Sequence, residues 1–268
     1  MTDRDLGVRV QLMQQLADDA GVIALKYFQS STLSIETKSD ASPVTEADLA
    51  IEAMIRARVL AEFPHDALLG EEHGEHAGTS GFRWVIDPID GTVSFANGVP
   101  LFATLIAIEH GARVEAGICA MHALHERVWA ARGSGAWWER TNASGLCVRT
   151  AARVRQCMHL SDALVCTTGL EYFERSNTTD ALGSVAKAAA RVRGWSDCYG
   201  GLLVATGRAD AWIEPVMHPW DSGPFTVIFE EALGVFTDWR GDANIHGGSA
   251  LACCAELHAE LLRSVQSR

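Results

Sequence analysis

The residues whose types and spacing best suit metal binding and catalysis lie in one short segment, Trp84-Val85-Ile86-Asp87-Pro88-Ile89-Asp90-Gly91-Thr92. We expect an apolar strand to end on Asp87, Pro88 to turn the chain and Asp90 to follow, so that both carboxylates converge at one edge of a sheet. Hard divalent cations prefer oxygen ligands, so this segment suits Mg²⁺ better than Zn²⁺. If a helix begins at Thr92, the amides of Gly91 and Thr92 point outward and can bind a phosphate.

Two more acidic positions lie at the expected ends of elements. Glu71 follows an apolar run after a loop marked by proline, and Asp221 comes just before a predicted helix. Taken alone, Asp221 could be a helix N-cap, Glu71 a solvated loop charge, and the Asp87–Asp90 turn a simple cap. Spacing by itself therefore leaves the metal site and the capping interpretation both open.

Hydrophobic periodicity predicts the elements that must position these side chains. An amphipathic helix is expected from Val8 to Tyr27, and a second one with Ile51 to Phe63 on its apolar side has Asp48 near its start. Strands grouped early as a meander, with helices alternating later, indicate an α+β fold of layered sheet and helix. The expected strands are 33–37, 82–86, 103–109, 114–120, 127–131, 164–168 and 209–214, and the further helices are 180–191, 221–231 and a last helix through 257–265.

Length and composition set the class of protein. The 268 residues are expected to form one unit, 1–268, in which a boundary near Thr150 would separate halves 1–150 and 151–268. A net charge of −12 argues against nucleic acid as a partner. The seven cysteines show no zinc-ligand spacing and are expected to be reduced. Neither a long apolar run nor a signal-peptide pattern is apparent, so we expect a cytoplasmic protein without a membrane partner.

Four separated segments together resemble the motifs of the inositol monophosphatase family of Mg²⁺-dependent, lithium-sensitive phosphatases. They occur in the family's order and span nearly the whole chain. The resemblance implies a layered α/β/α/β/α sandwich, a small phosphorylated metabolite as substrate, two or three Mg²⁺ ions in each site, and a homodimer. The segments are Pro43-Val44-Thr45-Glu46-Ala47-Asp48, Gly70-Glu71-Glu72, Asp87-Pro88-Ile89-Asp90-Gly91-Thr92 and Trp220-Asp221.

The resemblance also implies which residues would bind metal. Glu71, Asp87 and the carbonyl of Ile89 would hold one Mg²⁺, and a third, weaker ion would lie near Glu71. Asp87, Asp90 and Asp221 would hold the second ion, with Asp87 as the bridge. Two ions about 4 Å apart could clamp the attacking and leaving oxygens of an in-line displacement.

Catalytic and substrate-binding roles follow from the same resemblance. Asp48 and Thr92 would orient and deprotonate the attacking water beside Glu71, without a phosphoenzyme. Glu214 matches a family position that contacts the substrate. The residues expected to contact the substrate are Asp90, Gly91, Thr92, Asp197, Glu214 and Asp221.

Within the family, the chain looks most similar to the histidinol-phosphatase branch, through residues 193–200, 236–239 and 246–250. Inositol phosphatases usually carry a small neutral residue where Asp197 falls. A carboxylate there would pair with the ammonium group of histidinol phosphate and would do nothing for a polyol. By spacing alone, Asp197 could equally cap a helix. The implied reaction is hydrolysis of histidinol phosphate, a step of histidine biosynthesis.

Two alternatives remain open at this stage. Within the enzyme class, the substrate could be inositol monophosphate or a nucleotide 3′,5′-bisphosphate, although the acids Asp197 and Glu214 argue mildly against a bisphosphate. From another class, the chain could be a catalytically silent relative that binds or regulates a partner. The complete set of clustered acids speaks against that reading, because such acids repel one another.

Overall fold

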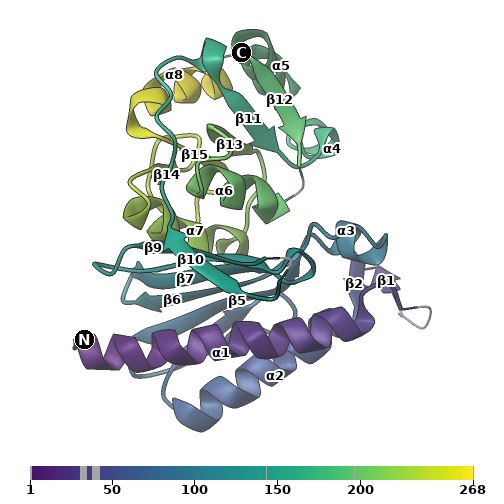
Figure 1. Ribbon diagram of the computed structural model, residues 1–268, viewed down its shortest axis with the longest axis vertical. Helices are drawn as coiled ribbons and strands as arrows, with labels where there is room; N and C mark the ends of the chain where they lie inside the picture. The colour runs from purple at the N-terminus through teal and green to yellow at the C-terminus, as the bar shows by residue number, and fades with distance from the viewer. Residues whose placement is uncertain (1, 31–34, 38–42, 143, 196, 268) are drawn as a thin grey trace.

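Helix and sheet alternate in five layers along the long axis of the molecule, as seen in the computed structural model (Figure 1). The structure describes residues 2–30, 35–37, 43–142, 144–195 and 197–267. Two helices cover the outer face of an eight-stranded sheet, two more fill the space between this sheet and a five-stranded one, and two cover the far face of the second sheet. The predicted α+β sandwich of five layers is confirmed.

The first sheet is largely an antiparallel meander, as predicted from the strand-like runs that follow one another in the first half of the chain. Its order is β10-β9-β8-β7-β6-β5-β3-β4, and β3 is the strand that pairs in parallel, with β5. The strands are β3 (Ala67–Gly70), β4 (Gly74–His76), β5 (Phe82–Asp90), β6 (Ala103–His110), β7 (Arg113–Met121), β8 (Glu126–Ala131), β9 (Ala136–Thr141) and β10 (Cys147–Ala151).

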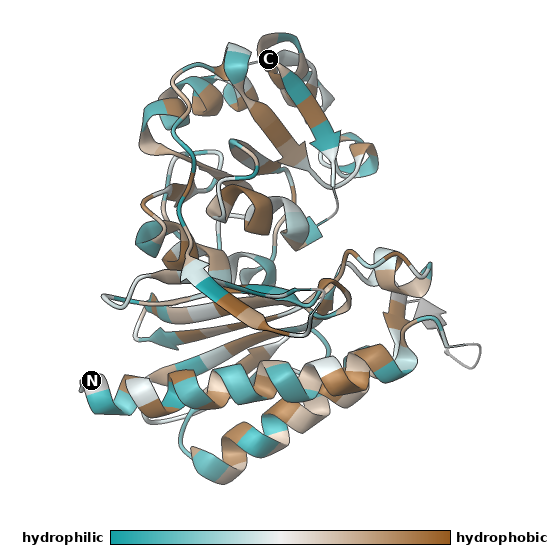
Figure 2. Ribbon diagram, viewed as in Figure 1, coloured by the Kyte–Doolittle hydropathy of each residue, from teal (hydrophilic) through white to brown (hydrophobic). Residues whose placement is uncertain are grey.

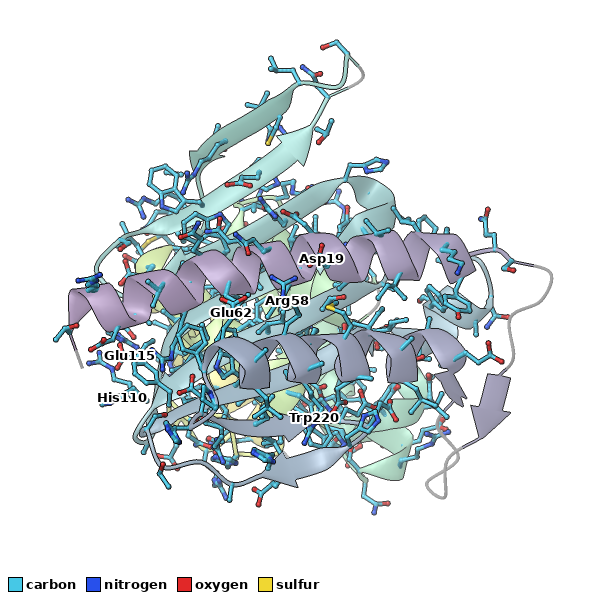
Figure 3. All side chains as sticks on the ribbon, turned by 90° about the horizontal axis from the view of Figure 1, so that it is seen from below. Asp19, Arg58, Glu62, His110, Glu115 and Trp220 are labelled. Atoms are coloured by element: carbon cyan, nitrogen blue, oxygen red, sulfur yellow. The ribbon has the colours of Figure 1, made fainter. Side chains whose placement is uncertain are left out.

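Helices α1 (Asp3–Tyr27) and α2 (Glu46–Glu62) lie side by side across the outer face of this sheet (Figure 3). Both are amphipathic, so that hydrophilic and hydrophobic residues alternate along them (Figure 2). Their apolar sides pack on Trp84, Ile86 and other residues of the same sheet face. On the solvent side, Arg58 of α2 donates to Asp19 of α1 at 2.7 Å, which joins the two helices.

The second half of the chain forms the five-stranded sheet, in the order β12-β11-β13-β15-β14. Helices α6 and α7 pack between the two sheets, and α5 and α8 lie together beyond the second. The elements are β11 (Leu164–Thr167), β12 (Arg191–Gly194), β13 (Ala211–Glu214), β14 (Val235–Thr237), β15 (Ala250–Cys253), α4 (Leu170–Arg175), α5 (Thr179–Ala188), α6 (Asp197–Ala205), α7 (Pro219–Glu231) and α8 (Ala255–Gln266).

Short elements connect the layers near the cleft described below. Helix α3 follows directly after Gly91, as predicted, and packs on β2. In the described part of the chain, no helix is long and apolar enough to span a membrane. The short elements are β1 (Ile35–Thr37), β2 (Pro43–Thr45), α3 (Thr92–Ala96) and the 3₁₀-helices η1 (His122–Leu124) and η2 (Leu160–Asp162).

Several boundaries differ from the sequence-based expectations, and three of them change how the elements are described. The strand expected over 33–37 is described from Ile35 onward as β1, because residues 33 and 34 lie outside the described residues. The helix expected over 180–191 ends at Ala188, and Arg191 begins β12 beside β11. The strand expected to end before Pro88 continues through it to Asp90 as β5. A proline lacks only its own N–H, which a bulge in a strand can tolerate.

Candidate active site

A cleft of about 340 Å³ lies where the end of β5 meets the starts of α6 and α7. Nine of the ten residues predicted to bind metal, substrate or water line it, and the tenth, Asp48, lies outside its lining. The nine are Glu71, Asp87, Ile89, Asp90, Gly91, Thr92, Asp197, Glu214 and Asp221. Residues from both halves of the chain therefore meet in one place, as the resemblance implied.

A β-bulge brings Asp87 and Asp90 to the same face of the sheet. In a regular strand, residues three apart point to opposite faces. Here Asp87 pairs with Leu105 and Asp90 with Ala103, so that Pro88 and Ile89 together oppose a single residue of β6. The extra residue shifts the alternation by one position, and both carboxylates face the inner layer while Ile89 packs toward α1 and α2.

Asp221 completes a group of three carboxylates. Oxygens of Asp87, Asp90 and Asp221 all lie within 4.8 Å of one another. The interpretation of Asp221 as an N-cap is wrong: α7 begins at Pro219, His218 is its N-cap, and Asp221 occupies the third helical position. There one carboxylate oxygen accepts from the His218 amide at 2.7 Å, which orients the side chain over the helix start.

Asp90 also joins the two halves of the chain. Its Oδ2 accepts a hydrogen bond of 2.8 Å from the amide of Cys198, in the first turn of α6. Gly91, the next residue, has φ of 83°. A Cβ at Gly91 would lie 2.8 Å from the carbonyl oxygen of Leu101, so glycine is required for the chain to turn into α3 here.

Burial and mutual repulsion raise the pKa values of these acids. Burial, and after it the charges of Glu71, Asp90 and Asp221, raises the pKa of Asp87 well above its ordinary value. Burial followed by Asp197 and Asp221 does the same for the pKa of Asp90. Burial raises the pKa of Asp221 to about 7 even though the His218 amide opposes the shift. Such crowding of like charges is relieved when a cation binds between them.

Unsatisfied oxygens give independent support for a bound cation. Asp87 Oδ1 and Asp48 Oδ1 are buried and accept no hydrogen bond. Buried polar atoms normally have partners, so each such oxygen needs an explanation. The three side chains of this group, Asp87, Asp90 and Asp221, offer carboxylate oxygens, which is the ligand type that Mg²⁺ prefers. The residues present therefore fit a hard divalent cation.

Asp48 lies deeper than the cleft. Its Oδ2 accepts from the amide and hydroxyl of Thr45 at 2.8 and 2.5 Å, which closes a capping box at the start of α2. Burial raises the pKa of Asp48 to about 7, helped by the charges of Glu72 and Glu71. The Thr92 hydroxyl donates to the Ile89 carbonyl at 3.0 Å. Among the described residues, no hydrogen bond joins Asp48 to Thr92, so their predicted cooperation remains a proposal.

Asp197 and Glu214 line the same cleft as the three-carboxylate group. Asp197 begins α6 with φ of 34°, and its Oδ2 is 3.2 Å from the position a Cβ on Gly91 would take. Glu214 is buried and accepts from Thr168 at 2.9 Å and from the Trp212 indole at 2.8 Å. Burial raises the pKa of Glu214 well above its ordinary value.

Sequence reasoning missed Glu52, which holds the loop that carries Glu71. Glu52 is fully buried on α2, and its carboxylate accepts from the amides of Glu72 and His73 at 2.7 and 3.1 Å. Gly70 packs against it, because a Cβ there would meet Glu52 Oε1 at 1.9 Å. A glutamate four residues after Asp48 in a predicted helix gives no signal of this role. Other residues of the cleft lining were also missed, among them Tyr172, Arg175 and His218.

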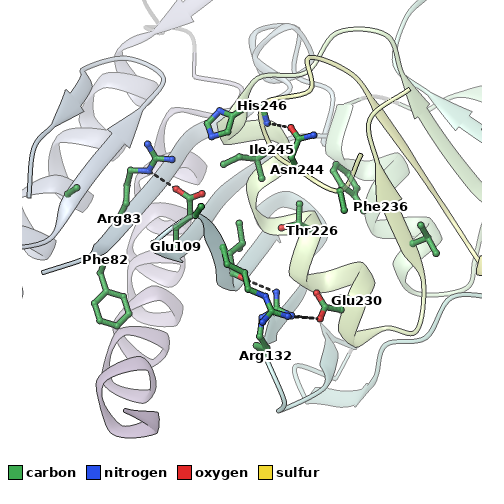
Figure 4. A pocket seen from close by; sticks show the side chains of 18 of the residues that line it. Phe82, Arg83, Glu109, Arg132, Thr226, Glu230, Phe236, Asn244, Ile245 and His246 are labelled. Atoms are coloured by element: carbon green, nitrogen blue, oxygen red, sulfur yellow. Dashed lines mark hydrogen bonds and ion pairs between the residues drawn. The ribbon is translucent and has the colours of Figure 1, made fainter. Parts of the chain in front are cut away.

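A larger cavity, of about 710 Å³, is a poor candidate for the reaction (Figure 4). Its charged side chains neutralise one another: Arg83 donates to Glu109 at 2.5 Å, and Arg132 is paired with Glu230. Within the described ranges, the group of acidic, histidine or cysteine side chains that could hold a metal is the one in the smaller cleft.

Comparison with known proteins agrees with this geometry. Residues 8–268 match the model of the inositol monophosphatase family, so the chain belongs to that family and is a phosphatase of this class. It is 40% identical to a histidinol-phosphatase of Chlorobaculum parvum over 90% of each chain, and 36% identical to one of Streptomyces coelicolor over 97% of each. A solved structure of an inositol monophosphatase from Zymomonas mobilis, 27% identical, superimposes with a TM-score of 0.83 over 100% of both chains.

Proposed function

We propose that the protein is a Mg²⁺-dependent histidinol-phosphatase, which hydrolyses histidinol phosphate to histidinol and phosphate. The observation that carries the metal chemistry is the group of three carboxylates with oxygens within 4.8 Å, beside the unsatisfied oxygen of Asp87. The relatives named histidinol-phosphatase support the substrate. Magnesium as the ion, a homodimer and a cytoplasmic location are part of the proposal and rest on the family resemblance.

The metal ligands would be Glu71, Asp87, the carbonyl of Ile89, Asp90 and Asp221. Mg²⁺ bound there would offset the negative charges of the acids and of the phosphate and would lower the pKa of water. The chain's own groups then do the rest. The amides of Gly91 and Thr92, at the turn into α3, hold the phosphate oxygens. The Thr92 hydroxyl orients the water, and Asp48, with a pKa of about 7, accepts its proton directly or through one further water.

The substrate's organic part would extend toward Asp197 and Glu214. Both carboxylates line the cleft that also contains the proposed metal ligands. The substrate's ammonium group offers hydrogen-bond donors and a positive charge, which a pair of carboxylates binds well in a partly dry cleft. Trp220 and His218 stack at 4.9 Å beside the same cleft and offer an aromatic surface to an imidazole ring.

Phosphate release from a substrate panel tests the proposal. Histidinol phosphate, inositol 1-phosphate and adenosine 3′,5′-bisphosphate should be compared at identical Mg²⁺, with and without EDTA. We expect kcat/KM for histidinol phosphate to exceed that for the other two by about tenfold or more. Equal efficiency would remove the substrate assignment and leave the phosphatase. The absence of metal-dependent phosphate release from all three would contradict the proposed function itself.

A further inference from the structure

The β-bulge between Asp87 and Asp90 positions both carboxylates. It leaves the main-chain carbonyls of Pro88 and Ile89 without their regular partners in the sheet. Pro88 has no N–H, and Pro88 and Ile89 together oppose Thr104 of β6. Buried carbonyl oxygens need hydrogen bonds. Threonine hydroxyls supply them: Thr92 donates to the Ile89 carbonyl at 3.0 Å, and Thr104 donates to the Pro88 carbonyl at 2.8 Å. A side chain therefore replaces the missing ladder bond at the centre of the bulge.

The Thr104 hydroxyl is itself held in place. Thr104 is fully buried, and its oxygen lies 2.8 Å from Nε2 of His122. A hydroxyl has one hydrogen, which goes to Pro88, so Thr104 accepts from His122 and the Nε2 atom carries a proton. Burial, with a smaller contribution from Arg127, lowers the pKa of His122 to about 4 and keeps the ring neutral.

His122 is wedged between α1 and the sheet. A Cβ on Gly21 of α1 would lie 2.6 Å from Nδ1 of His122, so the glycine makes room for the ring. On another side the ring lies 6.5 Å from that of Phe102. The imidazole therefore has little freedom to turn, and a continuous path of contacts runs from α1 through His122 and Thr104 to the bulge.

We propose that Thr104 and His122 are positioning residues of the metal site, which set the bulge so that Asp87 and Asp90 converge. This inference rests on the proposed metal site. Neither side chain touches the carboxylates; both act through the Pro88 carbonyl. Without the Thr104 hydroxyl, that carbonyl would be buried and unsatisfied, and the peptide between Asp87 and Asp90 would rotate to find another donor. The spacing of the two ligands would change with it.

Calorimetric titration of Mg²⁺ into the substrate-free protein tests the proposal. Thr104→Val keeps the shape and removes the donor, and should weaken Mg²⁺ binding by about tenfold, as loss of an orienting hydrogen bond does in other metal sites. Thr104→Ser keeps the hydroxyl and should stay within about twofold of the wild type. The matched control is Thr237→Val, because Thr237 bonds Nε2 of His258 at 2.9 Å in the other sheet. It should leave Mg²⁺ affinity unchanged.

Replacing the histidine provides a second route should Thr104→Val not fold. His122→Phe keeps a ring against α1 and removes the donor, and should weaken Mg²⁺ binding by roughly threefold. If the wild type binds Mg²⁺ and the folded Thr104 and His122 variants bind it equally well, the two residues are only structural and the inference fails alone. If the wild type binds no divalent cation, the metal site and the inference fail together.

Discussion

Two acids with the same degree of burial behave in opposite ways in this molecule. Asp66, 1% exposed, accepts from Arg9 at 2.7 and 2.8 Å and from Trp84 at 2.9 Å. Burial raises its pKa, but these bonds and one from Ser80 outweigh burial and lower the pKa overall. Asp87, 2% exposed, has no arginine or lysine partner among the described residues, and its pKa is well above the ordinary value.

This difference separates buried acids that stabilise the fold through ion pairs from the acids of the cleft, which do not. Outside the cleft, several buried acids have an arginine of the same chain, for example Glu139 with Arg127 at 2.7 Å and Asp210 with Arg155 at 2.7 Å. Asp87, Asp90 and Asp221 repel one another instead. Groups with strongly perturbed pKa values in a cleft are candidates for function, because such repulsion is not needed for folding.

The largest expected effect is a loss of activity when an acid of the cleft is replaced, compared with a loss of stability when an acid paired with arginine is replaced. Asp90→Asn keeps an oxygen to accept from Cys198 but removes a metal ligand, so phosphate release should fall on the order of 1000-fold. Stability of the metal-free protein should not decrease, because a repelling charge is lost. Asp66→Asn should do the reverse, with activity retained in the folded protein and stability lowered by about 3 kcal/mol. Assays of phosphate release and urea unfolding of both variants check this. Near-normal turnover by Asp90→Asn would defeat the assignment of the site.

A smaller effect should distinguish substrates. Asp197→Asn removes the charge proposed to bind the ammonium group, so kcat/KM for histidinol phosphate should fall roughly 10- to 100-fold. The value for inositol 1-phosphate should change little, since a polyol has no cation. Asp180→Asn, an exposed acid at the start of α5, is the matched control and should affect neither substrate. Equal losses with both substrates would mean that Asp197 shapes the site and does not select the ligand.

The smallest expected effect is the dependence of stability on pH. It comes from Asp48 and Asp221, whose pKa values are both about 7 in the folded protein. Their ordinary value is 3.8, so between the two values the folded state holds protons that the unfolded state has released. Stability of the metal-free protein should therefore fall as pH rises from about 4 to about 7, and then level off. Saturating Mg²⁺ should oppose the fall, because it binds the ionised acids.

Calorimetric melting at several pH values, with Mg²⁺ or EDTA, measures this dependence. Mg²⁺ should raise the melting temperature more at pH 8 than at pH 5, by several degrees for a chain of this size. Asp221→Asn should flatten the curve in EDTA. A melting temperature in EDTA that rises steadily over this pH range would contradict the sign of the argument.

The sequence predicted the architecture and most of the cleft. Hydrophobic patterns located the main helices and the meander, because α1 and α2 bury one apolar face each and β5 to β8 are apolar runs buried on both faces of the sheet. The motifs placed Glu71, Asp87, Asp90 and Asp221 together through family resemblance, and the cleft contains all four. Spacing alone could not do this, since Asp221 reaches the site from α7, a helix in the layer between the two sheets.

What the sequence could not predict depends on strand register and on packing between distant segments. Nothing in the run around Pro88 says that β5 continues through it, because the bulge is defined only by pairing with β6. Thr104, His122 and Glu52 look like ordinary residues of a strand, a turn and a helix. Their hydrogen bonds to the site's backbone appear only when the layers are assembled.

The bulge also limits how this strand can change over evolutionary time. If β5 lost this bulge and kept all its residues, regular alternation would turn Asp90 toward α1 and α2, where Trp84 and Ile86 already point. No single substitution could undo that reversal, because direction is set by the count of residues and not by their kind. The pairing of Asp87 with Leu105 and of Asp90 with Ala103 is therefore what natural variation in this strand has to preserve.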